Sequence, residues 1–345
     1  MIQKFFAARN ARASQSAVNR SSAIAEVLES RIQLSANEIL VNTAVDENDG
    51  PGVGTGTSLR EAVELANNDA NIDTIRFAAS LDGVTLFLEG QQYGQMTITQ
   101  PLSIIGNGPE NTVINGQRQS RIFDIPKDVG EVSFEGMTLT KGMTTEDGTT
   151  SGAQNLTGGA AIRAGRNTNI LISNCYFFDN KTLGLNAFGG AIFSSETVSV
   201  DNSEFEFNST RGGDADGGAI WTYILTCTNS LFVNNLTTGN ASKGGAIGGG
   251  TIVSTNSDFI SNRTYGISSS GGAIGSSQVI RSQSNFHDNS TKKDEARGGA
   301  IQSTFGDIQD SAFTNNYTIG AGGAGGALAF LHNETFASIK RCVFE

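Results

Sequence analysis

Oxygen-bearing side chains cluster near the N-terminus, in the run Asp46-Glu47-Asn48-Asp49-Gly50. Ca²⁺ prefers several hard oxygen ligands, and a glycine lets the chain turn around the ion, so calcium binding is one interpretation of this run. The bidentate acid that an EF-hand places at the end of its loop is missing, which favours a polar turn without a ligand. We therefore predict no cofactor and no metal site, with calcium at this turn as the alternative.

Carboxylates that could cleave a polysaccharide occur in the second half of the chain. Glycoside hydrolysis needs two carboxyl groups within about 5–9.5 Å of each other. Among the eight-residue segments that precede each Gly-Gly, Asp214 and Asp216 lie in one and Lys243 in the next, and acids return only at residues 292–297, so neighbouring segments do not align two acids. His287 and His332 have no serine or cysteine nucleophile in a recognisable motif. We predict no catalytic residues and a non-enzymatic protein, with a polysaccharide lyase or hydrolase as the alternative.

Composition narrows the choice of partners. The chain has 345 residues, a formal net charge of -11 and 37% hydrophobic residues, enough to bury a core. A surface with this charge repels phosphate backbones, so nucleic acid is not expected as a partner. No apolar run reaches the roughly 18 residues that a membrane helix requires, and the N-terminus lacks the apolar centre of an ordinary secretory signal. The three cysteines have no metal-binding spacing.

The second half of the chain is an internal repeat. The tetrapeptide Gly-Gly-Ala-Ile begins at positions 189, 217, 244, 271 and 298, with a variant at 325 and a looser copy at 158. The pattern Phe-x-x-Asn keeps the same period, and eight residues always separate its asparagine from the next Gly-Gly. Equal spacing means that each unit superposes on the next, because one inserted residue would turn the faces of a strand around. The repeat is therefore that of a solenoid.

Short strands, not helices, fit each unit, because glycine, serine, asparagine and threonine recur and no long helical period appears. In the unit from Gly244, Ile247, Ile252 and Phe259 indicate up to three short strands. The predicted fold is all-β: a right-handed parallel β-helix, similar to the pectate-lyase solenoid. Stacking predicts a core ladder of Phe177, Phe205, Phe232, Phe259, Phe286, Phe313, Ile192, Ile220, Ile247, Ile274, Ile301 and Leu328.

The repeated asparagines predict a ladder of stacked side-chain amides, formed by Asn180, Asn208, Asn235, Asn262, Asn289 and Asn316. All six belong to Asn-x-Thr triplets, so glycosylation is the alternative. A triplet at the same point of every unit favours an inward structural role. Two residues before each phenylalanine, Cys175 and Cys342 replace a recurring serine and lie too far apart in the stack for a disulfide.

One helix is predicted in the irregular N-terminal half. Ser58 is a candidate N-cap with Glu61 three residues later, and Leu59, Ala62 and Val63 begin an apolar face. A solenoid must cover its first apolar turn, so this segment is predicted to be a short N-terminal capping helix.

Three segments resemble known families. The run from Thr57 to Ala62, TSLREA, resembles the CSLREA region ahead of bacterial secreted β-helices. Leu28, Glu29, Arg31, Leu34 and Ser35 resemble the LEPR-x-LLS sorting motif of planctomycete surface proteins. The alternation of Gly-Gly-Ala-Ile with Phe-x-x-Asn is similar to the passenger repeats of chlamydial polymorphic outer-membrane proteins, which serve surface display and adhesion.

These resemblances imply a domain order and a location. We predict a disordered N-terminal sorting segment (1–37), then the cap and irregular first turns (38–142), then the regular array (143–345), truncated at the C-terminus. The predicted protein is extracellular or on the outer cell surface. It is adhesin-like and binds an unknown protein or carbohydrate through variable loops, and a purely structural envelope protein is the remaining alternative.

Overall fold

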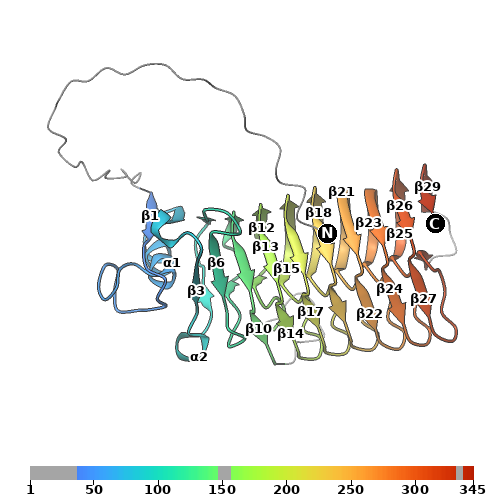
Figure 1. Cartoon of the computed structure of the whole chain (residues 1–345), viewed down its shortest axis with the longest axis horizontal. Coiled ribbons are helices and arrows are strands. Elements are labelled where there is room, and N and C mark those ends of the chain that lie inside the picture. Colours follow the sequence, from blue (N-terminus) through green and yellow to red (C-terminus); the bar gives the residue numbers. More distant parts are fainter. Residues whose placement is uncertain (1–36, 147–156, 332–336) are drawn as a thin grey trace, which may run out of the picture. The chain divides into compact units, whose positions relative to one another are not determined.

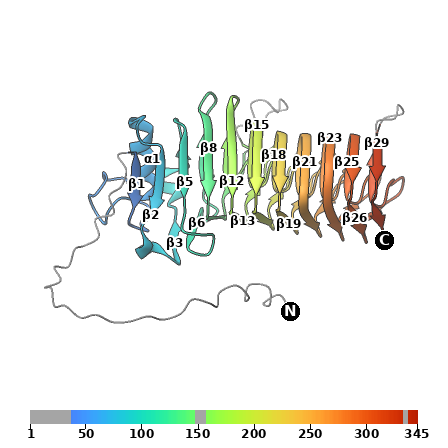
Figure 2. The ribbon, with the colours of Figure 1, turned by 90° about the horizontal axis from the view of Figure 1, so that it is seen from above.

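The computed structural model describes residues 37–146, 157–331 and 337–345, all within one compact unit (Leu34–Glu345). This unit is mostly β and forms a parallel β-solenoid of about nine turns, here called coils (Figures 1 and 2). The predicted repeat and parallel β-helix are therefore confirmed. The predicted sorting residues Leu28, Glu29, Arg31, Leu34 and Ser35 lie outside the described residues, as does His332.

The chain forms its elements in a simple order. The first coils contain α1 (Leu59–Asn68), the 3₁₀ helix η1 (Ala79–Leu81), α2 (Gly90–Tyr93) and the strands β1 (Glu38–Val41), β2 (Thr74–Phe77), β3 (Val84–Phe87), β4 (Met96–Thr97), β5 (Leu102–Ile105), β6 (Thr112–Asn115), β7 (Phe123–Ile125), β8 (Gly130–Glu135), β9 (Thr138–Thr140) and β10 (Met143–Thr144). The regular coils contain β11 (Ile162–Ala164), β12 (Thr168–Ser173), β13 (Tyr176–Phe178), β14 (Lys181–Thr182), β15 (Ile192–Asp201), β16 (Glu204–Glu206), β17 (Ser209–Thr210), β18 (Ile220–Thr228), β19 (Leu231–Val233), β20 (Leu236–Thr237), β21 (Ile247–Ile260), β22 (Arg263–Tyr265), β23 (Ile274–His287), β24 (Ser290–Lys292), β25 (Ile301–Gln309), β26 (Ala312–Thr314), β27 (Tyr317–Ile319), β28 (Leu328–Phe330), β29 (Ala337–Lys340) and β30 (Val343–Phe344).

Like residues meet like residues from coil to coil. In the large sheet, Ile192 pairs with Ile220, and the same column continues through Ile247, Ile274, Ile301 and Leu328. A second sheet contains only the short strands β10, β14, β17, β20, β22, β24 and β27, which follow the lower edge of the stack in Figure 1.

The strand boundaries differ from the sequence prediction. In the coil from Gly244, Ile247, Ile252 and Phe259 all lie in the single 14-residue strand β21. The second strand of this coil, β22, contains none of the predicted apolar residues. The expectation of short apolar strands in this unit is wrong, because Asn256 bends the chain at φ 50° without ending the strand.

The one 28-residue repeat shows how the solenoid accepts an extra residue. Between β15 and β18, Ser194 pairs with Thr222 but Thr197 pairs with Ile224, so two residues oppose one in a β-bulge. Val198 beyond the bulge still points inward and is fully buried. The expectation that one inserted residue turns the faces of a strand around is therefore wrong here, because the bulge absorbs the extra residue.

The paired glycines are required for two different steric reasons. In the pairs that begin at 189, 217, 244, 271, 298 and 325, the first glycine is left-handed, as at Gly244 with φ 70°. The second passes close to the next coil: a Cβ on Gly245 would lie 2.1 Å from the Gly272 carbonyl oxygen. Alanine fits neither position, so this corner of the coil requires both glycines.

The core changes character along the stack. In the regular coils, phenylalanine rings from Phe177 to Phe344 stack with centroids 4.7–5.0 Å apart and nearly parallel planes. In the first coils the core is mainly aliphatic, and Ile75 stacks on Ile104. Helix α1 packs against β1, β2 and β4. It begins with a capping box in which the Ser58 side chain accepts from the Glu61 N–H and the Glu61 carboxylate accepts from the Ser58 N–H.

Candidate functional site

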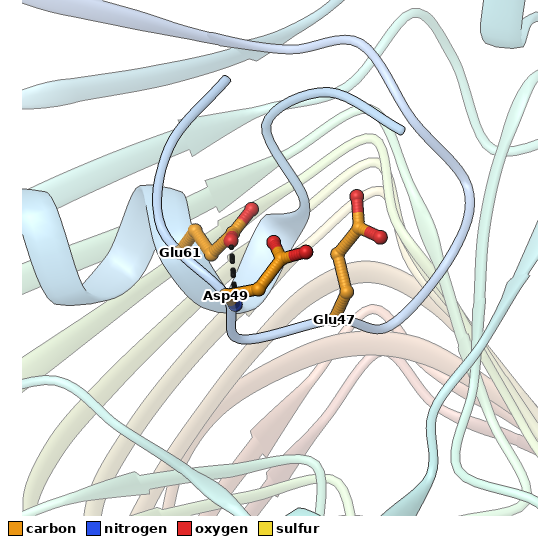
Figure 3. Close-up of side chains that lie close together, drawn as sticks. All are labelled: Glu47, Asp49 and Glu61. Carbon is orange, nitrogen blue, oxygen red and sulfur yellow. Dashed lines mark hydrogen bonds between the residues drawn. The ribbon is translucent and has the colours of Figure 1, made fainter. Parts of the chain in front are cut away.

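Three carboxylates meet beside the start of α1. Oxygen atoms of Glu47, Asp49 and Glu61 all lie within 4.8 Å of one another (Figure 3). Glu61 comes from the first turn of α1, and the other two come from the loop between β1 and α1. Clustered carboxylate oxygens are the ligands that Ca²⁺ and Mg²⁺ prefer. Among the described residues, this cluster is the candidate for a cation site.

Backbone hydrogen bonds already use much of this cluster. The Glu61 carboxylate accepts from the Ser58, Gly50 and Asp49 N–H groups at 2.9, 2.9 and 3.2 Å. Burial raises the pKa of Glu61, but these hydrogen bonds outweigh it and leave the pKa below its ordinary value. Glu47 accepts from the Thr55 hydroxyl and N–H. Desolvation and the two neighbouring acids raise the pKa of Asp49.

The structure rearranges the predicted calcium turn. Asp46 is withdrawn from it, because the Arg60 guanidinium donates to both Asp46 carboxylate oxygens at 2.8 and 2.9 Å with both side chains buried. Asp46 also accepts from the Glu89 N–H. Glu61 replaces it in the cluster, although the sequence analysis treated Glu61 only as a capping residue. The missed signal is that a capping-box glutamate also faces the loop before the helix.

Asp214 and Asp216, the predicted acids of the enzyme alternative, follow β17 on one loop. Asp214 is exposed, whereas Asp216 is partly buried and accepts from the Lys243 N–H at 2.7 Å. Burial raises the pKa of Asp216 to about 7, while the Lys243 charge acts in the opposite direction. A carboxyl group that keeps its proton near neutral pH has the property that a general acid needs.

The histidine of the described chain has a local partner. His287 lies at the end of β23, and its Nε2 is 2.9 Å from Asp288 Oδ2, with both side chains partly exposed. Asp288, which directly precedes the ladder residue Asn289, thus forms an ion pair with His287 when the histidine is protonated.

The six predicted ladder asparagines form one continuous row of hydrogen bonds. Each amide Nδ2 donates to the next asparagine Oδ1 at 3.0–3.1 Å, from Asn180 to Asn316. The same Nδ2 also donates to a carbonyl of the preceding coil, as Asn235 does to Phe205. Asn180 to Asn289 in this row are fully buried, and Asn316 is partly buried. A glycosylating enzyme could not reach the five buried amides in the folded chain.

Two further columns have roles that sequence reasoning did not predict, although it noted the recurring serine. The serine column is a second buried ladder, since each serine N–H donates to the next serine Oγ, as Ser230 does to Ser257 at 3.2 Å. Cys175 begins this column by donating its N–H to Ser203, and all three cysteines are free thiols. The residue before the serine is exposed and left-handed in most coils, as in Asn202 and Asn229. The dipeptide Asn-Ser was the available signal, because asparagine tolerates this conformation.

The outer face of the seven-stranded sheet contains bases in an otherwise acidic protein. From β14 to β27 the threonine of each strand points inward, and the residues one and three places after each ladder asparagine belong to the opposite face. On that face Ser209 and Ser290 are buried, the side chains of Lys181, Arg263 and Lys292 are half-buried, and Arg211 is exposed. These two columns, here called the basic strip, contain four bases and no acid. The basic strip consists of Lys181, Leu183, Ser209, Arg211, Leu236, Thr238, Arg263, Tyr265, Ser290, Lys292, Tyr317 and Ile319.

Comparison with known proteins gives no relative: the chain matches no protein-family model and no curated protein sequence. Within residues 37–146, 157–331 and 337–345, no helix has the length and apolar character needed to cross a membrane.

Proposed function

We propose that this chain is a non-enzymatic β-helix of the cell exterior, secreted or held on the outer surface, which binds a protein or carbohydrate ligand through its outward columns and loops. The supporting observation is that the inward and outward residues of each coil differ in how constant they are. The inward phenylalanine, asparagine and serine columns repeat, and each contacts its own copy on the next coil, whereas most outward positions change from coil to coil. A scaffold of this kind can change its surface without changing its core.

Two finer structural features belong to this proposal. We infer that the solenoid is right-handed, because parallel strands joined by crossovers almost always have this hand. We also infer that α1 caps the first coil, since its buried residues Leu59, Ala62, Val63 and Ala66 pack on strands at that end. The hand of the coils and the solvent exposure of this end in a crystal structure test both inferences.

Surface location is tested by protease treatment of intact producing cells, with lysed cells as the control. We expect intact cells to lose the protein within the time that lysed cells do, while a cytoplasmic marker survives. Protection of the chain until lysis would contradict the proposal.

The raised pKa of Asp216 supports a second candidate, a carbohydrate-active enzyme. The purified chain is incubated with polygalacturonate and calcium, and unsaturated or reducing-end products are followed. We expect none. Products that disappear in the Asp214→Asn/Asp216→Asn variant would replace the binding proposal by the enzymatic one.

A further inference from the structure

We infer that the basic strip is a binding site for a linear sulfated polysaccharide, which lies across the seven-stranded sheet from coil to coil. This inference rests on the proposed function and names the ligand class and the face that binds it. Sequence reasoning did not assign this face, because its bases belong to different coils and are 29 to 52 residues apart in sequence.

The bases form a row along the stack. Lys181 and Arg211 lie on consecutive coils, and Arg263 and Lys292 lie on two further consecutive coils after a gap of one. Neighbouring coils are separated by about the 4.7–4.9 Å of the phenylalanine stack, so the distances between the four charges along the stack are multiples of this spacing. Short strands of two or three residues make the strip narrow, which suits a single extended chain better than a nucleic acid duplex.

Aromatic rings surround one of the bases. Lys292 Nζ lies 5.2 Å from the centre of the Tyr265 ring and 5.8 Å from that of Tyr317, on the coils before and after it. These cation–π contacts hold the ammonium group over the outer face. The interaction with Tyr265 keeps the pKa of Lys292 above its ordinary value, so this base is charged throughout the physiological range.

The acids around the strip determine how high the negative charge density of a ligand must be. Asp179 pairs with Lys181 at 2.6 Å and also with Arg118, and Asp214 and Asp294 lie in the loops beyond the strip. The remaining protein has a large negative charge, and exposed charges act over about 8 Å at physiological ionic strength. A ligand gains net attraction only if its anions are dense and lie directly over the bases. Sulfate esters on a sugar polymer satisfy this condition, and they stay ionised at every physiological pH.

Periodicity distinguishes a polysaccharide from a peptide. The positions of the strip recur with every coil, so its bases lie at multiples of the coil spacing. A polymer of repeating sugar units can make equivalent contacts at several such points, whereas the side chains of an acidic peptide vary. Membrane binding is disfavoured, because bases interrupt the apolar residues Leu183, Leu236 and Ile319 along the strip.

The repeat itself supplies conservative test substitutions. Ser209 and Ser290 occupy the column of Arg263, and Thr238 occupies the column of Arg211 and Lys292. The triple variant Arg211→Thr/Arg263→Ser/Lys292→Thr therefore contains only residues that the same fold accepts at these positions. The control removes two exposed bases outside the strip, Lys243→Ser/Arg297→Ser, in a column directly before the paired glycines where Ser270 is native.

Binding of the full chain is measured by isothermal titration calorimetry or surface plasmon resonance. The probes are heparin as the sulfated polymer, alginate as a carboxylated one, single-stranded DNA as a phosphate polymer and dextran as a neutral one. We expect salt-sensitive binding to heparin, weaker binding to alginate and DNA, and none to dextran. The triple variant is expected to raise the heparin Kd about tenfold or more, and the control variant to leave it within about twofold. Circular dichroism and thermal unfolding of both variants check the fold.

Three results would overturn the inference: no heparin binding, equal binding to DNA or alginate, or equal losses in the triple and control variants. None of them bears on surface location, so the proposed function would stand. Protection of the chain in intact cells, by contrast, would remove the proposed function while leaving the measured affinity intact.

Discussion

The first coils and the regular coils solve the same stacking problem in different ways. In the first coils, pairing strands are displaced by unequal numbers of residues: Ile75 pairs with Ile104, Ile104 with Phe134, but Phe134 with Ile172. In the regular coils the displacement is 27 or 28 from Phe177 to Phe313, as from Phe205 to Phe232, and it rises to 31 only at the last step, from Phe313 to Phe344. Equal coils place like side chains next to each other, so phenylalanine, asparagine and serine ladders form only there.

The two regions also treat buried polar groups differently. The first coils bury ion pairs: Arg60 with Asp46, and Arg121 with Asp124, whose carboxylate also pairs with Arg163. Burial lowers the pKa of Arg121 to about 10. The regular coils instead bury neutral amides and hydroxyls that bond to their own copies. Where the chain repeats, it can satisfy polar groups by translation; where it does not, each group needs a specific partner.

The ion pair of the first coils should show the largest effect. We expect Arg60→Ala to lower the free energy of unfolding by about 3–5 kcal/mol, because it leaves Asp46 buried without its partner. Chemical denaturation measures this. Arg76→Ala is the control, since the Arg76–Glu38 pair is exposed and should contribute less than about 1 kcal/mol. Equal losses in the two variants would show that the buried pair has no special role.

The asparagine ladder should show the next largest effect. Asn235→Ala removes an amide that accepts from Asn208 and donates to Asn262, leaving buried groups unpaired. We expect a loss of about 3 kcal/mol in the same denaturation experiment. Asn256→Ala, in the exposed column, should lose only about 1–2 kcal/mol, which is the cost of a left-handed alanine. If the exposed asparagine mattered as much, the inward amides would not be the stabilising ones.

A residue exchange within one column should have the smallest effect. Cys175 begins the serine column where the regular coils meet the first coils, and burial raises its pKa to about 12. Cys175→Ser should change stability by less than about 1 kcal/mol, because a serine here can donate to the Ser173 carbonyl as Ser203 does to Asp201. Thermal unfolding of the variant measures the change, and a loss above about 2 kcal/mol would show that the column discriminates between sulfur and oxygen.

Sequence reasoning reached furthest where the chain repeats. The period, the phenylalanine ladder and the inward isoleucine column follow from the spacing of Gly-Gly-Ala-Ile and Phe-x-x-Asn. The capping box at Ser58 follows from a local signal. The continuous strand β21 and the bulge near Thr197 could not be predicted, because both depend on how a neighbouring coil accommodates the backbone.

The sequence by itself determined which residues of the regular coils stack in one column, because a fixed spacing brings equivalent residues into register whatever the shape of the coil. Only the tertiary structure decided which outward residues share a face and which acids meet. Glu61 joined Glu47 and Asp49 through the loop before α1, and Arg211, Arg263 and Lys292 became one basic strip through stacking. The physical reason is that a solenoid brings residues a full coil apart to within about 5 Å, so surface neighbours are distant in sequence.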